Sequence, residues 1–121
     1  MLTASYDGTA KIWNAGVGLC LQTLSGHTGF VTSAVYSLDW GSVLTASDDK
    51  TAKIWNDGSK MTGGECIQTL SGTANYAVFS QDGWAVLTPS DYTARIWIAS
   101  TGECAQKLSG HTGLLTSAVF A

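Results

Sequence analysis

Hydrophobic and β-branched residues occur along this chain in short runs, and turns rich in Gly, Asp and Asn separate the runs. No run has a helical period, and the only proline is Pro89. Short runs of this kind between turn residues predict β-strands in an antiparallel meander. In the stretch from 24 to 71 the expected strands are FVTSAVYS (30–37), SVLTAS (42–47), AKIWN (52–56) and CIQTL (66–70).

This four-strand pattern repeats. TAKIW occurs at 9–13 and at 51–55, and TARIW occurs at 93–97, so equivalent residues lie 42 positions apart. A single four-stranded unit cannot bury both faces of its sheet, so successive units are expected to stack on one another. The sequence therefore predicts an all-β repeat protein, with two complete units at about 28–71 and 74–109.

Motifs at fixed places in the repeat resemble those of the WD40 family. Gly26-His27 precedes a first strand, Ser-x-Asp-x-Thr precedes a third strand, and a tryptophan ends that strand. The resemblance covers the whole chain and implies four-stranded blades of a β-propeller around a central channel. The chain also departs from the pattern. The Trp-Asp pair of the family is replaced by Trp13-Asn14, Trp55-Asn56 and Trp97-Ile98, and Gly72-Thr73 replaces one Gly-His.

The resemblance implies a structural role for the polar residues of the repeat. In the family, the aspartate before the third strand holds the loop histidine, which contacts a hydroxyl that accepts the indole N–H. Buried polar groups are tolerated together when each satisfies the next, so we expect structure rather than catalysis. The central set is His27, Thr45 (or Ser47), Asp49 and Trp55. The repeat without a histidine has Thr88, Asp91 and Trp97, and the remaining set is His111, Thr3, Asp7 and Trp13.

Composition and charge exclude several classes of function. Only 12% of the residues are charged and the net charge is −3 with six basic residues, so neither nucleic acid nor an anionic membrane is an expected partner. No apolar run reaches membrane-spanning length and the N-terminus has no signal-peptide pattern. Cys20, Cys66 and Cys104 recur at one place in the repeat, without other ligands at metal-binding spacing. We expect free thiols, no metal, no cofactor and an intracellular, cytoplasmic protein.

The two ends of the chain carry complementary parts of one repeat. MLTAS at 1–5 corresponds to a second strand and LLTSAVFA at 114–121 to a first strand, and only the turn at 81–85 has no counterpart. The sequence thus predicts a single segment, 1–121, of three circularly permuted blades. In this arrangement, the strands within 1–25 are completed by the strand at 112–121 of a neighbouring chain.

Three blades are too few for a ring, so closure is expected through homo-oligomerisation with strand exchange between chains. Two chains would give six blades and three chains would give nine. The family more often has valine where this chain has Ala10, Ala52 and Ala94. Small residues there allow blades to approach at the rim, which favours the nine-blade trimer over the six-blade dimer, and both stay open.

By resemblance, the function is that of a protein-interaction platform that uses the face with the Gly-His and Asp turns. Candidate contacts on this face are Tyr6, Asp48, Phe30 and Leu114, although Phe30 and Leu114 fit the core between blades equally well. Trp40 and Trp84 are candidates on the opposite face, or pack over neighbouring hairpins.

The sequence predicts a self-assembling, non-catalytic scaffold for a protein or peptide. The alternative is a fragment, or an evolutionary or engineered intermediate, of a longer propeller whose main property is assembly. An enzyme with a site in the central channel is disfavoured, because the inner strands VTSAVYS, NYAVFS and LLTSAVFA carry no charge.

Overall fold

The computed structural model describes residues 1–37, 42–56, 66–71, 77–80, 83, 85–89, 93–99 and 101–109. All regular secondary structure in this part of the chain is β-strand, which confirms the all-β expectation. The strands are β1 (Leu2–Ala4), β2 (Thr9–Asn14), β3 (Leu19–Ser25), β4 (Val31–Tyr36), β5 (Ser42–Ser47), β6 (Thr51–Asn56), β7 (Cys66–Ser71), β8 (Val78–Phe79), β9 (Ala85–Pro89), β10 (Thr93–Ile98) and β11 (Cys104–Ser109).

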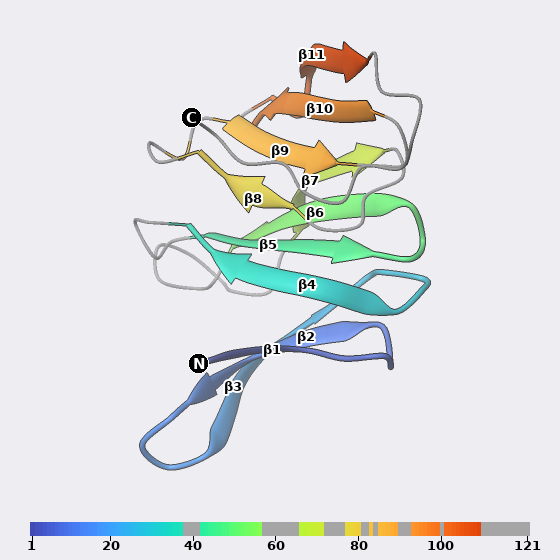
Figure 1. Cartoon of the computed structure of the whole chain (residues 1–121). Coiled ribbons are helices and arrows are strands. Elements are labelled where there is room, and N and C mark those ends of the chain that lie inside the picture. The colour runs from blue at the N-terminus through green and yellow to red at the C-terminus, as the bar shows by residue number, and fades with distance from the viewer. Residues whose placement is uncertain are drawn as a thin grey trace.

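The strands form three antiparallel sheets in chain order. The first sheet has the order β1-β2-β3, the central sheet β4-β5-β6-β7, and the third sheet β8-β9-β10-β11. Figure 1 shows the first sheet at the bottom, the central sheet above it and the third sheet at the top. Each sheet is thus a meander of consecutive strands, as the alternation of short apolar runs and turns predicts.

The register is the same in all three sheets. The strand pairs β2–β3, β6–β7 and β10–β11 each shift register at the tryptophan, between Ile12 and Trp13, Ile54 and Trp55, and Ile96 and Trp97. A bulge at this place increases the local twist and re-aims the side chain that follows it. The repeated TAKIW sequence therefore folds to the same local geometry each time.

Two hydrophobic clusters hold neighbouring sheets together. Between the first and central sheets, Ala10, Ile12 and Leu24 pack with Val31, Val43 and Trp55. Between the central and third sheets, the cluster comprises Leu44, Ala46, Ala52, Ile54, Leu70, Ala77, Val86 and Trp97. Because adjacent strand residues point to opposite faces, the central sheet contributes one face to each cluster. Every interface therefore joins the Ala-Ile-Leu face of one sheet to the tryptophan face of the next.

Candidate functional site

Four polar side chains form a continuous hydrogen-bonded network at the central sheet. His27 lies in the loop between β3 and β4, and its Nδ1 is 2.9 Å from Oδ2 of Asp49 in the β5–β6 turn. Its Nε2 is 2.6 Å from Oγ1 of Thr45, which also accepts the Trp55 indole N–H at 2.9 Å. The His27 side chain is completely buried. Thr45, rather than Ser47, is thus the hydroxyl between the histidine and the tryptophan.

The partners fix the direction of each hydrogen bond. The Trp55 N–H donates to Thr45, so the Thr45 hydroxyl hydrogen is available to His27 Nε2. Nδ1 of His27 then carries a hydrogen and donates a hydrogen bond to the Asp49 carboxylate, an assignment that follows from the network. Each group satisfies its neighbour, and no buried side-chain N or O atom among the described residues lacks a partner.

Asp49 is the charged end of this network. Partial burial on its own raises the pKa of the Asp49 carboxyl, but hydrogen bonds from Thr51, His27 and the Thr28 backbone outweigh burial and lower the pKa to about 2. The Thr51 hydroxyl and amide both donate to Oδ1, at 2.6 and 2.9 Å, and the Thr28 amide donates to Oδ2 at 3.1 Å. The carboxylate is therefore ionised at neutral pH and saturated with donors.

This lowered pKa predicts a loss of stability in acid. A depressed folded-state pKa contributes stability above the ordinary value of 3.8, and this contribution disappears as pH falls toward about 2. We expect the Asp49→Asn variant to be less stable than the wild type by roughly 1–2 kcal/mol at pH 6, with the gap narrowing between pH 4 and pH 2. Urea unfolding, followed by tryptophan fluorescence at several pH values, measures the gap. A gap that does not change with pH would contradict this role.

The first sheet repeats this geometry without a histidine among the described residues. The Trp13 indole donates to Thr3 Oγ1 at 2.8 Å, as Trp55 does to Thr45. The Thr9 hydroxyl and amide donate to Asp7 Oδ1 at 2.6 and 2.9 Å, the distances found at Asp49. These hydrogen bonds lower the pKa of Asp7.

The third sheet has the same indole contact. The Trp97 N–H donates to Thr88 Oγ1 at 2.8 Å, and both side chains are buried. Asp91, His111, Leu114, Trp40 and Trp84, which the sequence analysis also named, lie outside the described residues. Sequence reasoning did not assign a role to Thr51 or Thr9, although both belong to the Ser-x-Asp-x-Thr motif.

Close contacts with a side chain at Gly26 and with backbone at Gly29 explain the glycines on either side of His27. A Cβ at Gly26 would lie 3.2 Å from the Trp55 ring, and one at Gly29 would lie 2.9 Å from the Asp49 backbone nitrogen. The loop from Gly26 to Phe30 is therefore pressed against the β5–β6 turn. Glycine is needed where backbones approach this closely.

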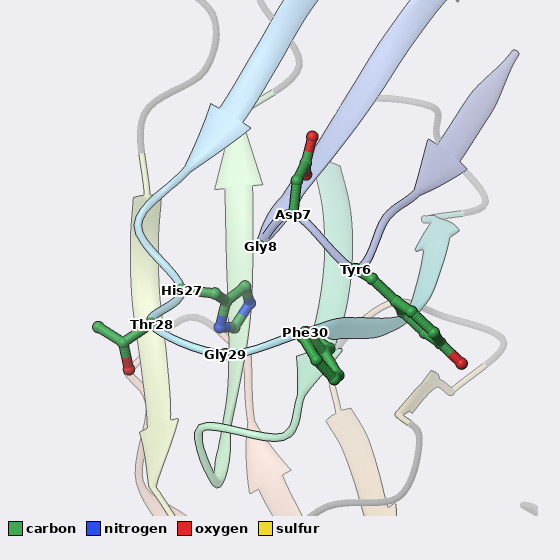
Figure 2. A pocket seen from close by; sticks show the side chains of 7 residues that line it. All are labelled: Tyr6, Asp7, Gly8, His27, Thr28, Gly29 and Phe30. Carbon is green, nitrogen blue, oxygen red and sulfur yellow. The ribbon is translucent and has the colours of Figure 1, made fainter.

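An exposed aromatic pair lies beside this loop. Tyr6, in the β1–β2 turn, stacks on Phe30 with ring centroids 4.8 Å apart and ring planes at 20°. The two rings and the loop border a hollow of about 140 Å³, lined by Tyr6, Asp7, Gly8, His27, Thr28, Gly29 and Phe30 (Figure 2). Asp48 is exposed, and its amide donates to the Phe30 carbonyl at 2.9 Å. The structure thus brings Tyr6, Phe30 and Asp48 to one end of the sheets.

Neither a cluster of metal-binding side chains nor a membrane-spanning helix occurs among the described residues. Across these residues there is no group of three or more His, Cys, Asp or Glu side chains that could hold a metal ion. A helix long and apolar enough to span a membrane is likewise absent from this part of the chain. The three cysteines are free thiols, and each Sγ contacts the carbonyl oxygen two residues ahead.

Comparison with known proteins gives one family. The model of the "WD domain, G-beta repeat" matches residues 1–14 and 18–56. Ribosome assembly protein 4 of Chaetomium thermophilum is 39% identical over 122 aligned residues, which cover 93% of this chain and 23% of that protein. The DENN domain and WD repeat-containing protein SCD1 of Arabidopsis thaliana is 27% identical over 122 residues, covering 99% of this chain and 10% of that protein. The chain thus spans less than a quarter of the length of either relative.

Proposed function

Since this chain belongs to the WD40-repeat family, we propose that it is a non-catalytic protein-interaction scaffold that assembles head-to-tail with further copies of itself. The observation that carries the proposal is the unequal exposure of equivalent residues in the three sheets. Leu24 and Leu70 are 0% and 1% exposed, whereas Leu108, at the same place in the third sheet, is 48% exposed. Leu108 therefore belongs to an Ala-Ile-Leu face that has no sheet against it in the described part of the chain, although Ala94 on that face is buried.

The first sheet presents the complementary face. Trp55 and Trp97 are 1% and 8% exposed, whereas the equivalent Trp13 is only half-buried. Both internal interfaces join an Ala-Ile-Leu face to a tryptophan face. The same contact between two chains would bury Leu108 of one copy against Trp13 of the next. Such an interface joins two different surfaces of the chain. It produces a ring when the rotation from one copy to the next brings the last copy back to the first.

The fourth strand of the first sheet is the second part of the proposal. Residues 110–121 read GHTGLLTSAVFA, close to the GHTGFVTSAVYS at 26–37 that supplies His27 and β4. We propose that this segment of a neighbouring copy lies alongside β1 and places His111 between Asp7 and Thr3. Support comes from Asp7 and Thr3, whose hydrogen bonds to Thr9 and Trp13 reproduce those of Asp49 and Thr45.

The number of chains in the ring is also a proposal. Ala10, Ala52 and Ala94 are 1%, 0% and 5% exposed, and the first two lie in the clusters between sheets. Small side chains here bring neighbouring sheets close, which favours a nine-blade trimer over a six-blade dimer.

A cytoplasmic location, which the free thiols favour, belongs to the same proposal.

Solution mass tests this assembly. We expect a single species of two or three times the 12.6 kDa chain mass in light scattering or native mass spectrometry. The Leu108→Asp variant should be a folded monomer, because a carboxylate on the exposed face opposes its burial against a second copy. Ile67→Asp is the matched control, since Ile67 is 53% exposed in the central sheet and should leave the mass unchanged. A stable wild-type monomer across concentrations would overturn the proposal.

The second candidate function is a fragment or intermediate of a longer propeller whose main property is assembly, without a specific ligand. The observation in its favour is that the segments 24–29 and 108–113 have the same sequence, LSGHTG, which indicates recent duplication. Both candidates predict the same solution mass. Binding of a partner separates them, because only a scaffold presents a surface that recognises one.

A further inference from the structure

We infer that the stacked Tyr6–Phe30 pair and the adjoining hollow bind a lysine or arginine side chain of a partner protein, which rests on the proposed scaffold role and names its partner chemistry. The two rings are 76% and 48% exposed. Large aromatic side chains that remain this exposed and mutually ordered are typical anchors of protein interfaces. The pair joins a turn of the first sheet to the entry of β4.

The backbone around the pair holds both rings in place before any partner binds. The Val31 amide donates to the Ser5 carbonyl at 3.0 Å, which ties the Phe30 segment to the turn that carries Tyr6. On the other side, the Asp48 amide donates to the Phe30 carbonyl at 2.9 Å. Two adjacent sheets thus fix one loop. A binding surface that is ordered in advance loses less conformational entropy on association.

The hollow has the size of a single side chain. Its volume of about 140 Å³ lies below the roughly 300–1,000 Å³ of sites that enclose whole small molecules. In Figure 2 the aromatic pair lies on one side of the view, and the loop from His27 to Gly29 lies on the other. The rings supply an apolar surface for the methylene stem of a long side chain, while His27, Thr28 and Gly29 of the loop form the facing wall.

The charged residues around the hollow favour a cationic ligand. The turns that flank the hollow carry three carboxylates, Asp7, Asp48 and Asp49, and one ammonium group, Lys50. Asp49 keeps its negative charge when it accepts a hydrogen bond from His27, and Asp7 would do so with His111 of a second copy. The field at the rings is therefore negative with or without assembly. A cation over an aromatic face gains further electrostatic stabilisation, whereas an acidic or phosphorylated peptide would be repelled.

Titration of the assembled chain with short peptides tests the inference. The probes are acetyl-Gly-Gly-Arg-Gly-Gly-amide and its lysine counterpart, and the neutral analogues carry citrulline or norleucine. We expect the cationic peptides to cause saturable shifts of the Gly8, Thr28 and Gly29 amide signals in ¹H–¹⁵N spectra. The neutral analogues should bind at least about fivefold more weakly, and added salt should weaken only the cationic peptides.

Variants separate this site from a general acidic surface. Tyr6→Ala should weaken the cationic peptides by about fivefold or more, whereas Tyr6→Phe, which keeps the ring, should bind like the wild type. Asp48→Asn should weaken binding, and Glu103→Gln is the matched control, because this exposed carboxylate lies in the β10–β11 turn at the other end of the strands. Tyr6→Ala should leave the solution mass unchanged, so failure of binding is distinguishable from failure of assembly.

Three results would overturn the inference. The first is equal binding of the citrulline or norleucine peptide, or tighter binding of a proline-rich peptide, because either makes the site apolar rather than cation-selective. The second is saturable shifts that lie away from the three named amides. The third is the absence of saturable shifts in a chain of the expected solution mass, which would leave the assembly standing and remove this site.

Discussion

Replacement of Thr45 with valine is expected to destabilise the chain by about 2–4 kcal/mol. Thr45 is 0% exposed, and its hydroxyl is the only group that joins the Trp55 indole to His27 Nε2 among the described residues. Valine keeps the shape and removes both hydrogen bonds, so two buried polar groups lose their partner and cannot reach water. Urea unfolding at pH 7, followed by tryptophan fluorescence, gives the free-energy difference.

Thr3→Val is the matched control for this experiment. Thr3 makes the same contact with Trp13 but is exposed, so water replaces the lost hydroxyl. In the unassembled Leu108→Asp background, we expect Thr3→Val to cost less than about 1 kcal/mol. An equal loss of unfolding free energy at Thr3 and Thr45 would mean that neither burial nor the histidine contact contributes to the stability that Thr45 provides.

Truncation of Leu70 to alanine should cost about 2–5 kcal/mol. Leu70 is 1% exposed in the cluster between the central and third sheets, where alanine would leave a cavity that the flanking strands cannot collapse to fill. Because the cluster joins two sheets, the variant should also weaken their contact. Thermal unfolding and the urea midpoint, both measured at one protein concentration, report the loss.

Leu108→Ala is the internal comparison, since this leucine occupies the same place and is 48% exposed. Below the concentration at which the chains assemble, its truncation should cost less than about 1 kcal/mol. Where the chains are assembled, the cost should rise toward that of Leu70→Ala, because the proposed interface buries the side chain. A cost at Leu108 that is small at every concentration would argue against that interface.

The local architecture could be predicted because its causes are local. Apolar runs with period two between turn residues specify the meanders, and the repeated TAKIW sequence specifies the register shift at each tryptophan. The pairing of Thr45 with Lys53, two residues before Trp55, follows from that register. The sequence left Thr45 and Ser47 open, because both lie on one face of the strand. The structure separates them, since the Ser47 hydroxyl accepts the Asp49 amide instead.

The aromatic site could not be predicted in the same way. Tyr6 and Phe30 belong to different repeats, and their stacking depends on how two sheets meet, which no short motif encodes. The sequence analysis therefore left Phe30 open between the core and a partner contact. In the structure Phe30 lies at the end of the sheets and is 48% exposed. The backbone hydrogen bonds of the Val31 and Asp48 amides hold its segment there.

The loop from Gly26 to Phe30 has a consequence for how such a chain can lengthen. It follows β3 along the polypeptide, yet its histidine serves Thr45 and Asp49 in the next sheet. A 42-residue period with such a histidine therefore carries one donor loop and one acceptor strand, wherever its boundaries are drawn, whereas the period with Gly72-Thr73 has no histidine in its loop. A gene duplication of that length adds one such loop together with one such strand, whichever residue the duplicated segment starts from. Growth by recombination thus tolerates imprecise crossover points, provided that the inserted length is a whole number of periods.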